Sequence, residues 1–327
     1  MRAITITELG GPEVLKLQDA PTPEPGEGEI LVDVRVAGVN FMDTGARQNG
    51  RADGALPFVP GVEAAGVVRE TGPGVGQFKP GDRVAWVYSY GAYAEQVVVP
   101  AAVAVPVPDT IDDETAAAIM MQGVTAHHFT TEAYPVKPGD VAVVHAAAGG
   151  LGKFVTQLVK QRGGTVIGIV SRSEKVAAAR AAGADHVVIS TGPDFVDEVR
   201  ELTGGLGAHV VYDGNGESTF RASMRALRPN GTMLYYGAFI GQVPTISMRE
   251  LPHSIKICYP VFRDHISTRE ALLSVTGELF LLVADGRLEV TIGGRYPLAE
   301  AGRAHRDIQS RSTTGKLILT IGADVAR

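Results

Sequence analysis

The sequence predicts an α/β protein: a doubly wound parallel sheet in the middle of the chain and a second, strand-rich domain built from its two ends. From about residue 122 to residue 263, short apolar runs alternate with stretches of helical periodicity. Before residue 122 the chain consists of short strand-like segments punctuated by Gly and Pro. A final strand-like segment, 316–321, finds no place in the predicted middle sheet. We therefore expect residues 1–121 and 264–327 to form one domain and residues 122–263 the other.

The first domain reads as an antiparallel, partly open barrel, because short strands follow one another with frequent Pro-Gly turns. Acidic residues at 112–114 open an Ala-rich helix, and we expect a second helix over 125–134. In the final stretch we expect a long helix with Leu272 and Leu279 on its apolar face, then a shorter helix over 300–309. The predicted strands are 30–36, 64–71, 83–87 and 94–99 in the first domain, and 141–144, 165–170, 186–189, 210–212, 232–236 and 255–259 in the middle.

The stretch 141–152 organises the middle domain. An apolar strand runs into a turn of small residues, and a helix begins near residue 151. Ala147, Gly149 and Gly152 occupy the three fingerprint positions of a dinucleotide-binding turn, with Ala in place of the first Gly. Such a turn presents the N–H groups of a helix N-terminus to a pyrophosphate. The contacts expected there are Ala148, Gly149, Gly150 and Leu151. A tight turn that binds no ligand is the alternative interpretation.

The end of the next strand indicates which dinucleotide is bound. NAD-binding proteins usually place an acidic residue there for the ribose 2′-hydroxyl. Here Ser171 takes that position, with Arg172 beside it and Lys175 one turn later. Exchanging an acid for cations suits a 2′-phosphate, and this favours NADPH. The alternative is that both cations are solvated residues at a helix start.

Composition narrows the class of protein. The 327 residues suffice for two domains, and the net charge of −6 is spread along the chain without a basic block, which argues against nucleic acid as a partner. No apolar run reaches transmembrane length, so a membrane partner is not expected. Cys258 is the only cysteine, which excludes an intrachain disulfide and makes a reducing cytoplasm the expected location.

Several segments together resemble the zinc-independent quinone oxidoreductase/ζ-crystallin family of the medium-chain dehydrogenase/reductase superfamily. The family signature is similar to one segment of this chain, which runs from Gly139-Asp140 through Ala146-Ala147-Ala148-Gly149-Gly150-Leu151-Gly152 to Gln157 and Lys160. One residue differs, because Val143 stands where the signature has Leu. Further similar motifs are Gly10–Leu15, Gly38-Val39-Asn40-Phe41-Met42-Asp43-Thr44, Pro80–Val84, Gly91-Ala92-Tyr93, Gly123-Val124-Thr125-Ala126 and Val211-Tyr212-Asp213. The resemblance covers nearly the whole chain. It implies a GroES-like catalytic domain and a Rossmann domain, with NADPH bound between them.

The resemblance also places site residues. It implies Asn40 near the nicotinamide with Asp43 close by; a turn residue bonded to its own backbone is the alternative for Asn40. No metal is expected, since Asn40 and Val62 stand where zinc-dependent relatives have Cys and His, and one cysteine cannot build a four-Cys site. The remaining residues expected at the cofactor are Thr125, Thr191 near the 2′-phosphate, Asn215 at the nicotinamide ribose, Phe239 along the same edge and Lys316 at a phosphate.

Two departures from the family fall near the nicotinamide. Gly45 replaces a Tyr that relatives commonly carry, and Gly214-Asn215-Gly216 replaces the more usual Ser-Val-Gly. The activity that the resemblance implies is hydride transfer from NADPH to a quinone or an α,β-unsaturated carbonyl. An enoyl-thioester or other specialised enone reductase is the first alternative, and a non-catalytic NADPH-binding protein is an alternative of another class. A homodimer is expected because the last strand of the middle sheet could form an edge.

Overall fold

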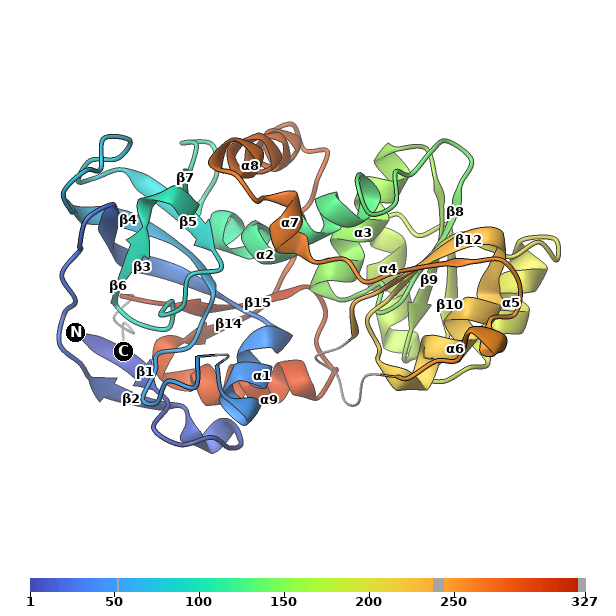
Figure 1. Ribbon diagram of the computed structural model, residues 1–327, viewed down its shortest axis with the longest axis horizontal. Helices are drawn as coiled ribbons and strands as arrows, with labels where there is room; N and C mark the ends of the chain where they lie inside the picture. The colour runs from blue at the N-terminus through green and yellow to red at the C-terminus, as the bar shows by residue number, and fades with distance from the viewer. Residues whose placement is uncertain (52, 238–243, 323–327) are drawn as a thin grey trace. The chain divides into compact units, whose positions relative to one another are not determined.

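The computed structural model describes residues 1–51, 53–237 and 244–322 (Figure 1). It contains two compact units. Met1–Gly123 and Ile266–Arg327 form what we call the terminal unit, and Val124–His265 form the central unit. The boundaries expected from the sequence, after residues 121 and 263, each lie two residues before those of the structure.

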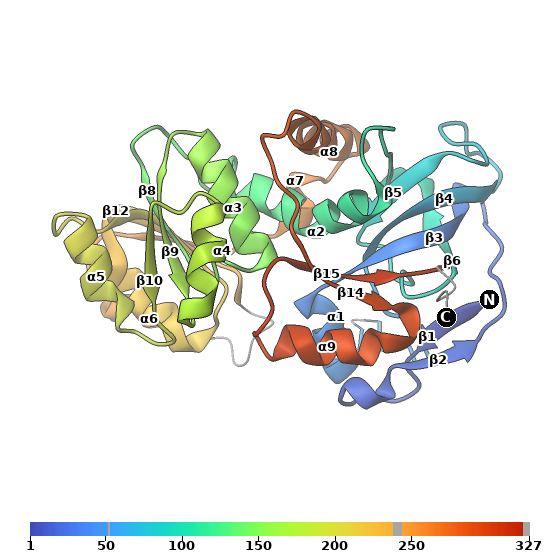
Figure 2. The same cartoon turned by 180° about the vertical axis from the view of Figure 1, so that it is seen from behind.

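The central unit is a six-stranded sheet in the order β10-β9-β8-β11-β12-β13, and every neighbouring pair is parallel. This confirms the doubly wound sheet. Helices α3 and α4 cover one face, and α5 and α6 pack together on the other (Figures 1 and 2). The elements are β8 (Val141–Val144), α3 (Gly150–Gln161), β9 (Thr165–Val170), α4 (Val176–Ala181), β10 (His186–Ile189), α5 (Phe195–Leu202), β11 (Ala208–Asp213), α6 (Glu217–Ala226), β12 (Leu227–Tyr235), β13 (Lys256–Cys258) and α7 (Phe262–His265).

The terminal unit is organised around the long strand β3 (Glu29–Val39), which pairs with β4 along most of its length, with β6 near its start and with β15 near its end. These pairs are antiparallel, as the sequence predicts, whereas β14 and β15 are parallel. The return of the last strand to this unit is confirmed. The other elements are β1 (Arg2–Thr5), β2 (Lys16–Asp19), α1 (Phe41–Asn49), β4 (Glu63–Thr71), β5 (Arg83–Val87), β6 (Gln96–Pro100), β7 (Ala104–Pro106), α8 (Arg269–Ala284), β14 (Ile292–Pro297), α9 (Ala301–Gln309) and β15 (Lys316–Thr320).

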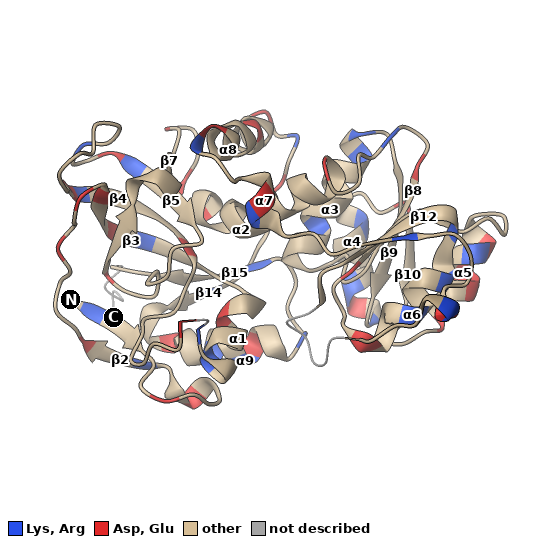
Figure 3. Ribbon diagram, viewed as in Figure 1, with Lys and Arg blue, Asp and Glu red and all other residues tan. Residues whose placement is uncertain are grey.

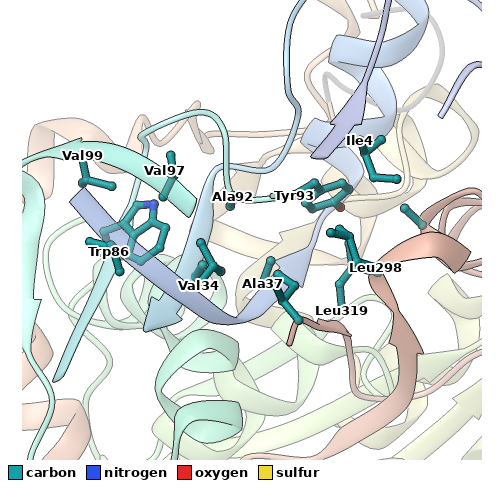
Figure 4. Close-up of a cluster of buried hydrophobic side chains, with 14 of the residues drawn as sticks. Ile4, Val34, Ala37, Trp86, Ala92, Tyr93, Val97, Val99, Leu298 and Leu319 are labelled. Carbon is teal, nitrogen blue, oxygen red and sulfur yellow. The ribbon is translucent and has the colours of Figure 1, made fainter. Parts of the chain in front are cut away.

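Apolar side chains from both ends of the chain fill the core of the terminal unit (Figure 4). Ile4 from β1, Val34 and Ala37 from β3 and Leu319 from β15 belong to one buried cluster. Tyr93 joins this cluster with its ring fully buried. The C-terminal strand therefore contributes to the same core as the N-terminal strand.

One predicted break is absent. A single helix, α2 (Asp113–Thr130), replaces the two helices expected before and after residue 125, and the boundary between the units lies within it. Glycine is a poor helix former, yet Gly123 lies inside this helix. In the structure a Cβ on Gly123 would lie 2.5 Å from Ile119 and 3.4 Å from Leu279 of α8. The glycine therefore provides room for packing and does not end the helix.

Acidic and basic residues are interspersed over helices and loops of both units (Figure 3). This agrees with a net charge of −6 that is not concentrated in one segment. Among the described residues, no helix combines the length and apolarity that a membrane crossing requires.

Candidate functional site

The turn after β8 offers backbone N–H groups at the start of α3. Gly149 is the N-cap residue and brings no side chain to occupy those groups. A Cβ on Gly152 would lie 2.3 Å from the carbonyl oxygen of Ala146, so only glycine fits there. Ala146 itself has a φ of 49°, and its carbonyl accepts the Gly149 N–H at 2.8 Å. The result is a tight turn whose exposed donors suit an anion.

Alanine is accommodated at the first fingerprint position because the neighbouring strand makes space for it. A Cβ on Gly168 of β9 would lie 2.9 Å from the Cβ of Ala147, which is fully buried. The missing first glycine of the turn is therefore offset by a glycine on the adjacent strand.

The ends of β9 and β10 bring the residues expected at a 2′-phosphate to one edge of the sheet. Val170 pairs with Ile189, and the Ser190 N–H donates to the Val170 carbonyl at 2.9 Å. Ser171 follows the first strand and Thr191 follows the second. Arg172 and Thr191 are exposed, and Lys175 ends the short 3-10 turn that follows.

The other residues predicted to contact the cofactor lie away from the ends of β9 and β10, or outside the described residues. Thr125 lies on α2, in the part of that helix that belongs to the central unit. Asn215 follows β11, and its amide Nδ2 lies 3.2 Å from Nδ1 of His145. Phe239 lies outside the described residues.

In the terminal unit, Asn40 is the N-cap of α1 and is buried. Its side-chain N–H donates to Glu63 Oε1 at 2.7 Å, and its side-chain oxygen accepts from the Lys316 ammonium at 2.7 Å. Asn40 and Asp43 also form a capping box at the start of α1, so the local backbone role of the alternative interpretation is present as well. The amide is in addition held between a carboxylate and a cation.

The position of Lys316 corrects the expectation that it meets a phosphate. Its side chain is 1% exposed and forms an ion pair with Glu63, whose side chain is 0% exposed. The ammonium is thus already committed to Asn40 and Glu63 inside the terminal unit. A cation that is buried and paired in this way is not available to a phosphate, and its partner Glu63 lies far away in the sequence.

Glycine at position 38 makes this ion pair possible. A Cβ on Gly38 would lie 2.2 Å from the Glu63 carboxylate. The second carboxylate oxygen of Glu63 accepts the Met121 N–H at 2.6 Å. Glu63 was not predicted as a site residue, although it directly follows Val62, which stands where zinc-dependent relatives have His.

A second buried network starts at Asp43. One carboxylate oxygen, Oδ2, accepts the Asn40 N–H at 2.8 Å and the Tyr93 hydroxyl at 3.1 Å. The Tyr93 oxygen lies 3.2 Å from Nε2 of His305, and Nδ1 of His305 lies 3.5 Å from the Arg47 guanidinium. Because Arg47 can only donate, His305 carries its proton on Nε2 and donates it to Tyr93, which in turn donates to Asp43.

Burial shifts the pKa values of this network strongly. Desolvation raises the pKa of Asp43 to about 7, even though the Asn40 N–H and Lys316 favour the ionised form. Burial, helped by Arg47, lowers the pKa of His305 to about 3, so its ring is neutral at physiological pH. Burial and Asp43 raise the pKa of Tyr93 well above its usual value. Tyr93 lay in a motif quoted for its resemblance, whereas nothing in the sequence around His305 pointed to the site.

The comparisons with known proteins identify the family. The alcohol dehydrogenase GroES-like domain matches residues 26–109, and the zinc-binding dehydrogenase family matches residues 150–275. Quinone oxidoreductase 1 of Escherichia coli is 36% identical over 315 residues, which cover 95% of this chain and 96% of the relative. The chain belongs to the quinone oxidoreductase family of the medium-chain dehydrogenase/reductase superfamily.

Other members of this family widen the comparison. The 2-haloacrylate reductase of a Burkholderia species is 36% identical over 326 residues, covering 97% of this chain and 98% of that protein. A mycobacterial protein complexed with NADPH superposes with a TM-score of 0.94 at 42% identity, covering 98% of this chain and all of that one. The E. coli quinone oxidoreductase complexed with NADPH also gives a TM-score of 0.94, at 35% identity, covering 98% of this chain and 100% of that one.

One matched family description mentions zinc. Within residues 1–51, 53–237 and 244–322, no group of three or more His, Cys, Asp or Glu side chains is arranged to hold a metal ion. At the two positions compared with zinc ligands, Val62 is fully buried and Asn40 holds the contacts described above. Zinc independence stays a prediction that metal analysis can test.

The raised pKa of Asp43 makes a prediction about stability. A carboxyl whose pKa rises from 3.8 to about 7 on folding contributes stability that is fully present below pH 3.8 and is lost as the pH rises through 7. Asp43→Asn mimics the protonated form and removes this dependence. Relative to wild type, the variant should gain unfolding free energy between pH 5 and pH 9, on the order of 4 kcal/mol at most. Urea denaturation at several pH values measures the difference.

The exposed Asp19→Asn variant is the control and should follow the wild-type profile. Parallel stability curves for wild type and Asp43→Asn would show that Asp43 titrates like an ordinary carboxyl.

Proposed function

We propose that this protein is an NADPH-dependent reductase that delivers a hydride to a quinone or an α,β-unsaturated carbonyl, without zinc. The main support is the edge of the central sheet, where an anion-binding turn lies on the same edge as two strand ends that carry Ser171, Arg172 and Thr191. Relatives named quinone oxidoreductase and solved with NADPH give that edge its expected ligand.

The residues present fit the cofactor. The uncapped N–H groups of Gly150 and Leu151 would donate to the pyrophosphate oxygens, in a turn that any Cβ at Gly152 would obstruct. Arg172 and Lys175 would hold the 2′-phosphate. When bound, NADPH supplies the hydride, and the protein supplies orientation and a hydrogen-bond donor.

Asn40 is the proposed donor. Two of its amide contacts are fixed, because the oxygen faces the Lys316 ammonium and one N–H faces Glu63. A flipped amide would place its NH₂ group against a cation, so the orientation is determined. Within the described part of the chain the other N–H has no partner, and we assign it to a substrate oxygen on which negative charge develops. The ammonium on the far side of the amide polarises it and strengthens that donor.

Asp43 is proposed to support Asn40 and not to touch substrate. It is fully buried, and its Oδ2 holds the backbone N–H of Asn40 at the first turn of α1. Its Oδ1 has no hydrogen-bond partner among the described residues. A protonated carboxyl fits this environment better than an ionised one, as its raised pKa indicates.

The acceptor class has two candidates. Most named relatives are quinone oxidoreductases. A relative with a similar sequence identity is named 2-haloacrylate reductase, and its named substrate is a conjugated acid. Gly45 lies within α1 in helical conformation, so the position that carries Tyr in many relatives here brings no side chain. Less side-chain volume beside the nicotinamide would favour a bulky or specialised acceptor.

A cytoplasmic homodimer completes the proposal. Strand β13 ends the central sheet, and Ile257, Tyr259 and Val261 on and beside it are exposed, with Tyr259 at 55%. Two such edges could pair across a two-fold axis. Light scattering should give twice the chain mass, and Ile257→Lys should halve it; a monomeric wild type would refute this part.

The function itself is tested by NADPH oxidation with 1,4-benzoquinone, a 2-enal and an enoyl thioester. We expect turnover of at least one acceptor, and we expect it to survive exhaustive chelation because the proposed donor is an amide. Metal analysis of the active protein is the control. Tight NADPH binding with no turnover of any acceptor would favour the non-catalytic alternative, and loss of activity on chelation would contradict zinc independence.

Cofactor choice is tested by fluorescence titration with NADPH and NADH. NADPH should bind much more tightly, and Lys175→Ala should weaken NADPH binding about tenfold while leaving NADH binding unchanged, since a charge-assisted contact to the 2′-phosphate is lost. Arg180→Ala, an exposed cation on α4, is the matched control. Equal affinities for both nucleotides in the wild type would remove the 2′-phosphate argument.

The buried ion pair gives a further prediction. Lys316→Met leaves the Glu63 carboxylate buried without its cation, which should cost about 3–5 kcal/mol of unfolding free energy. Adding Glu63→Gln should restore most of this stability because no lone charge remains. The folded double variant should still turn over at least tenfold more slowly than wild type, because the amide of Asn40 is no longer polarised.

The exposed Arg303→Met variant, which removes a surface ion pair with Glu300, is the control and should change neither stability nor turnover by much. Full turnover by the stable double variant would limit Lys316 to a structural role.

A further inference from the structure

The sheet of the central unit reverses its winding between β8 and β11. From this pair the strand order runs outward as β9 and β10 on one side and as β12 and β13 on the other. In open parallel sheets, ligands bind beyond the carboxyl ends of the strands at such a reversal. His145 directly follows β8, and Asp213 ends β11. Both side chains are fully buried.

His145 connects the two strand ends through both ring nitrogens. Its Nε2 lies 3.0 Å from the hydroxyl of Ser223, and its Nδ1 lies 3.2 Å from the side-chain nitrogen of Asn215. Its backbone N–H donates to the Tyr212 carbonyl at 3.1 Å. The edge of the ring packs against Phe195 at a centroid distance of 4.9 Å. The imidazole therefore has no freedom to rotate.

The direction of every hydrogen bond in this network follows from Asp213. Its carboxylate can only accept, and it lies 2.6 Å from the Ser223 hydroxyl, so Ser223 donates to it. Ser223 must then accept from Nε2–H of His145. Nδ1 is consequently unprotonated and accepts from the Asn215 amide. Burial lowers the pKa of His145, which keeps this neutral form in place.

The Asn215 end of the network fixes a second turn. The Asn215 N–H donates to Asp213 at 2.9 Å, and the Thr219 hydroxyl lies 2.9 Å from both oxygens of the same carboxylate. Gly216 has a φ of 82° and is the N-cap of α6. On the other side, Ala146, with its φ of 49°, directly follows His145. His145 thus joins the anion-binding turn after β8 to the turn after β11.

We propose that His145 is a positioning residue and that its hydrogen bond with Asn215 locks these two turns together before NADPH binds. This inference rests on the proposed NADPH-dependent function. The lock removes conformational freedom from the part of the site that would receive the pyrophosphate and the nicotinamide ribose. It does not reach the strand ends at Ser171 and Thr191, which would hold the 2′-phosphate.

The test uses Asn215→Val, which keeps a similar volume but cannot donate to Nδ1. Dissociation constants are measured by fluorescence or calorimetry for NADPH and for adenosine 2′-monophosphate, which reaches only the 2′-phosphate end. We expect NADPH binding to weaken about fivefold to tenfold, the effect of one hydrogen bond, with no change for the fragment. A general loss of folded structure would weaken both ligands.

A double-mutant cycle with His145→Gln separates the lock from a direct contact between Asn215 and the cofactor. Glutamine retains a donor for Ser223 but not the acceptor for Asn215. If the hydrogen bond between His145 and Asn215 is what positions the turns, the double variant should bind NADPH no more weakly than whichever single variant has the lower NADPH affinity. Ser218→Ala, which removes only a 3.4 Å contact to the Asn215 carbonyl, is the matched control and should bind like wild type.

Additive losses in the cycle, or wild-type NADPH affinity in Asn215→Val, would overturn the proposal. If His145→Gln does not fold, His145→Leu replaces it in the same cycle, because leucine fills a similar volume and has no ring nitrogen to accept from Asn215. A wild-type protein that fails to bind NADPH would instead refute the proposed function.

Discussion

The ion pair between Lys316 and Glu63 is the constraint on which the terminal unit depends. Two charges without solvent exposure are costly unless their remaining hydrogen-bonding capacity is used. Asn40 and the Met121 N–H use it, so segments from four parts of the chain meet at one point. The sheet register serves the same end, because Leu317 pairs with Val39 and thereby sets Lys316 beside Asn40. The last strand returns to the first domain for this charge as well as for its apolar residues.

The central unit solves a similar problem without a cation. Asp213 is as buried as Glu63, yet its partners are two hydroxyls and a backbone N–H, all neutral donors. Glu63 stands at the start of β4 and holds Asn40 at the start of α1, whereas Asp213 stands at the end of β11 and holds the turn that follows. Both networks therefore fix backbone at the places where ligand-binding groups are expected, which is how a rigid sheet supports an exact arrangement of loops.

The sequence predicted the fold well because the fold depends on local patterns. Apolar runs with Gly and Pro boundaries marked the strands of the central sheet, and the fingerprint turn marked the start of α3. The features that were predicted wrongly depend on contacts between residues that are far apart in the sequence. The continuity of α2 follows from Leu279 packing over Gly123, and the role of Lys316 follows from a carboxylate more than 250 positions away in sequence. His305 had no local signal at all, since its partners Tyr93 and Arg47 come from other segments.

The charge balance around Asn40 links stability to chemistry. The single positive charge of Lys316 can balance one buried carboxylate, and it is paired directly with Glu63. The carboxyl group of Asp43 therefore has no cation of its own in this cluster. With Asp43 protonated, the surroundings of Asn40 carry no net charge; with Asp43 ionised, they carry one negative charge. A substrate oxygen that gains negative charge at the free N–H of Asn40 is better stabilised in the first case. Burial of Asp43 disfavours its ionised form, so it costs folding free energy at neutral pH, whereas the proton that Asp43 retains favours the proposed transfer.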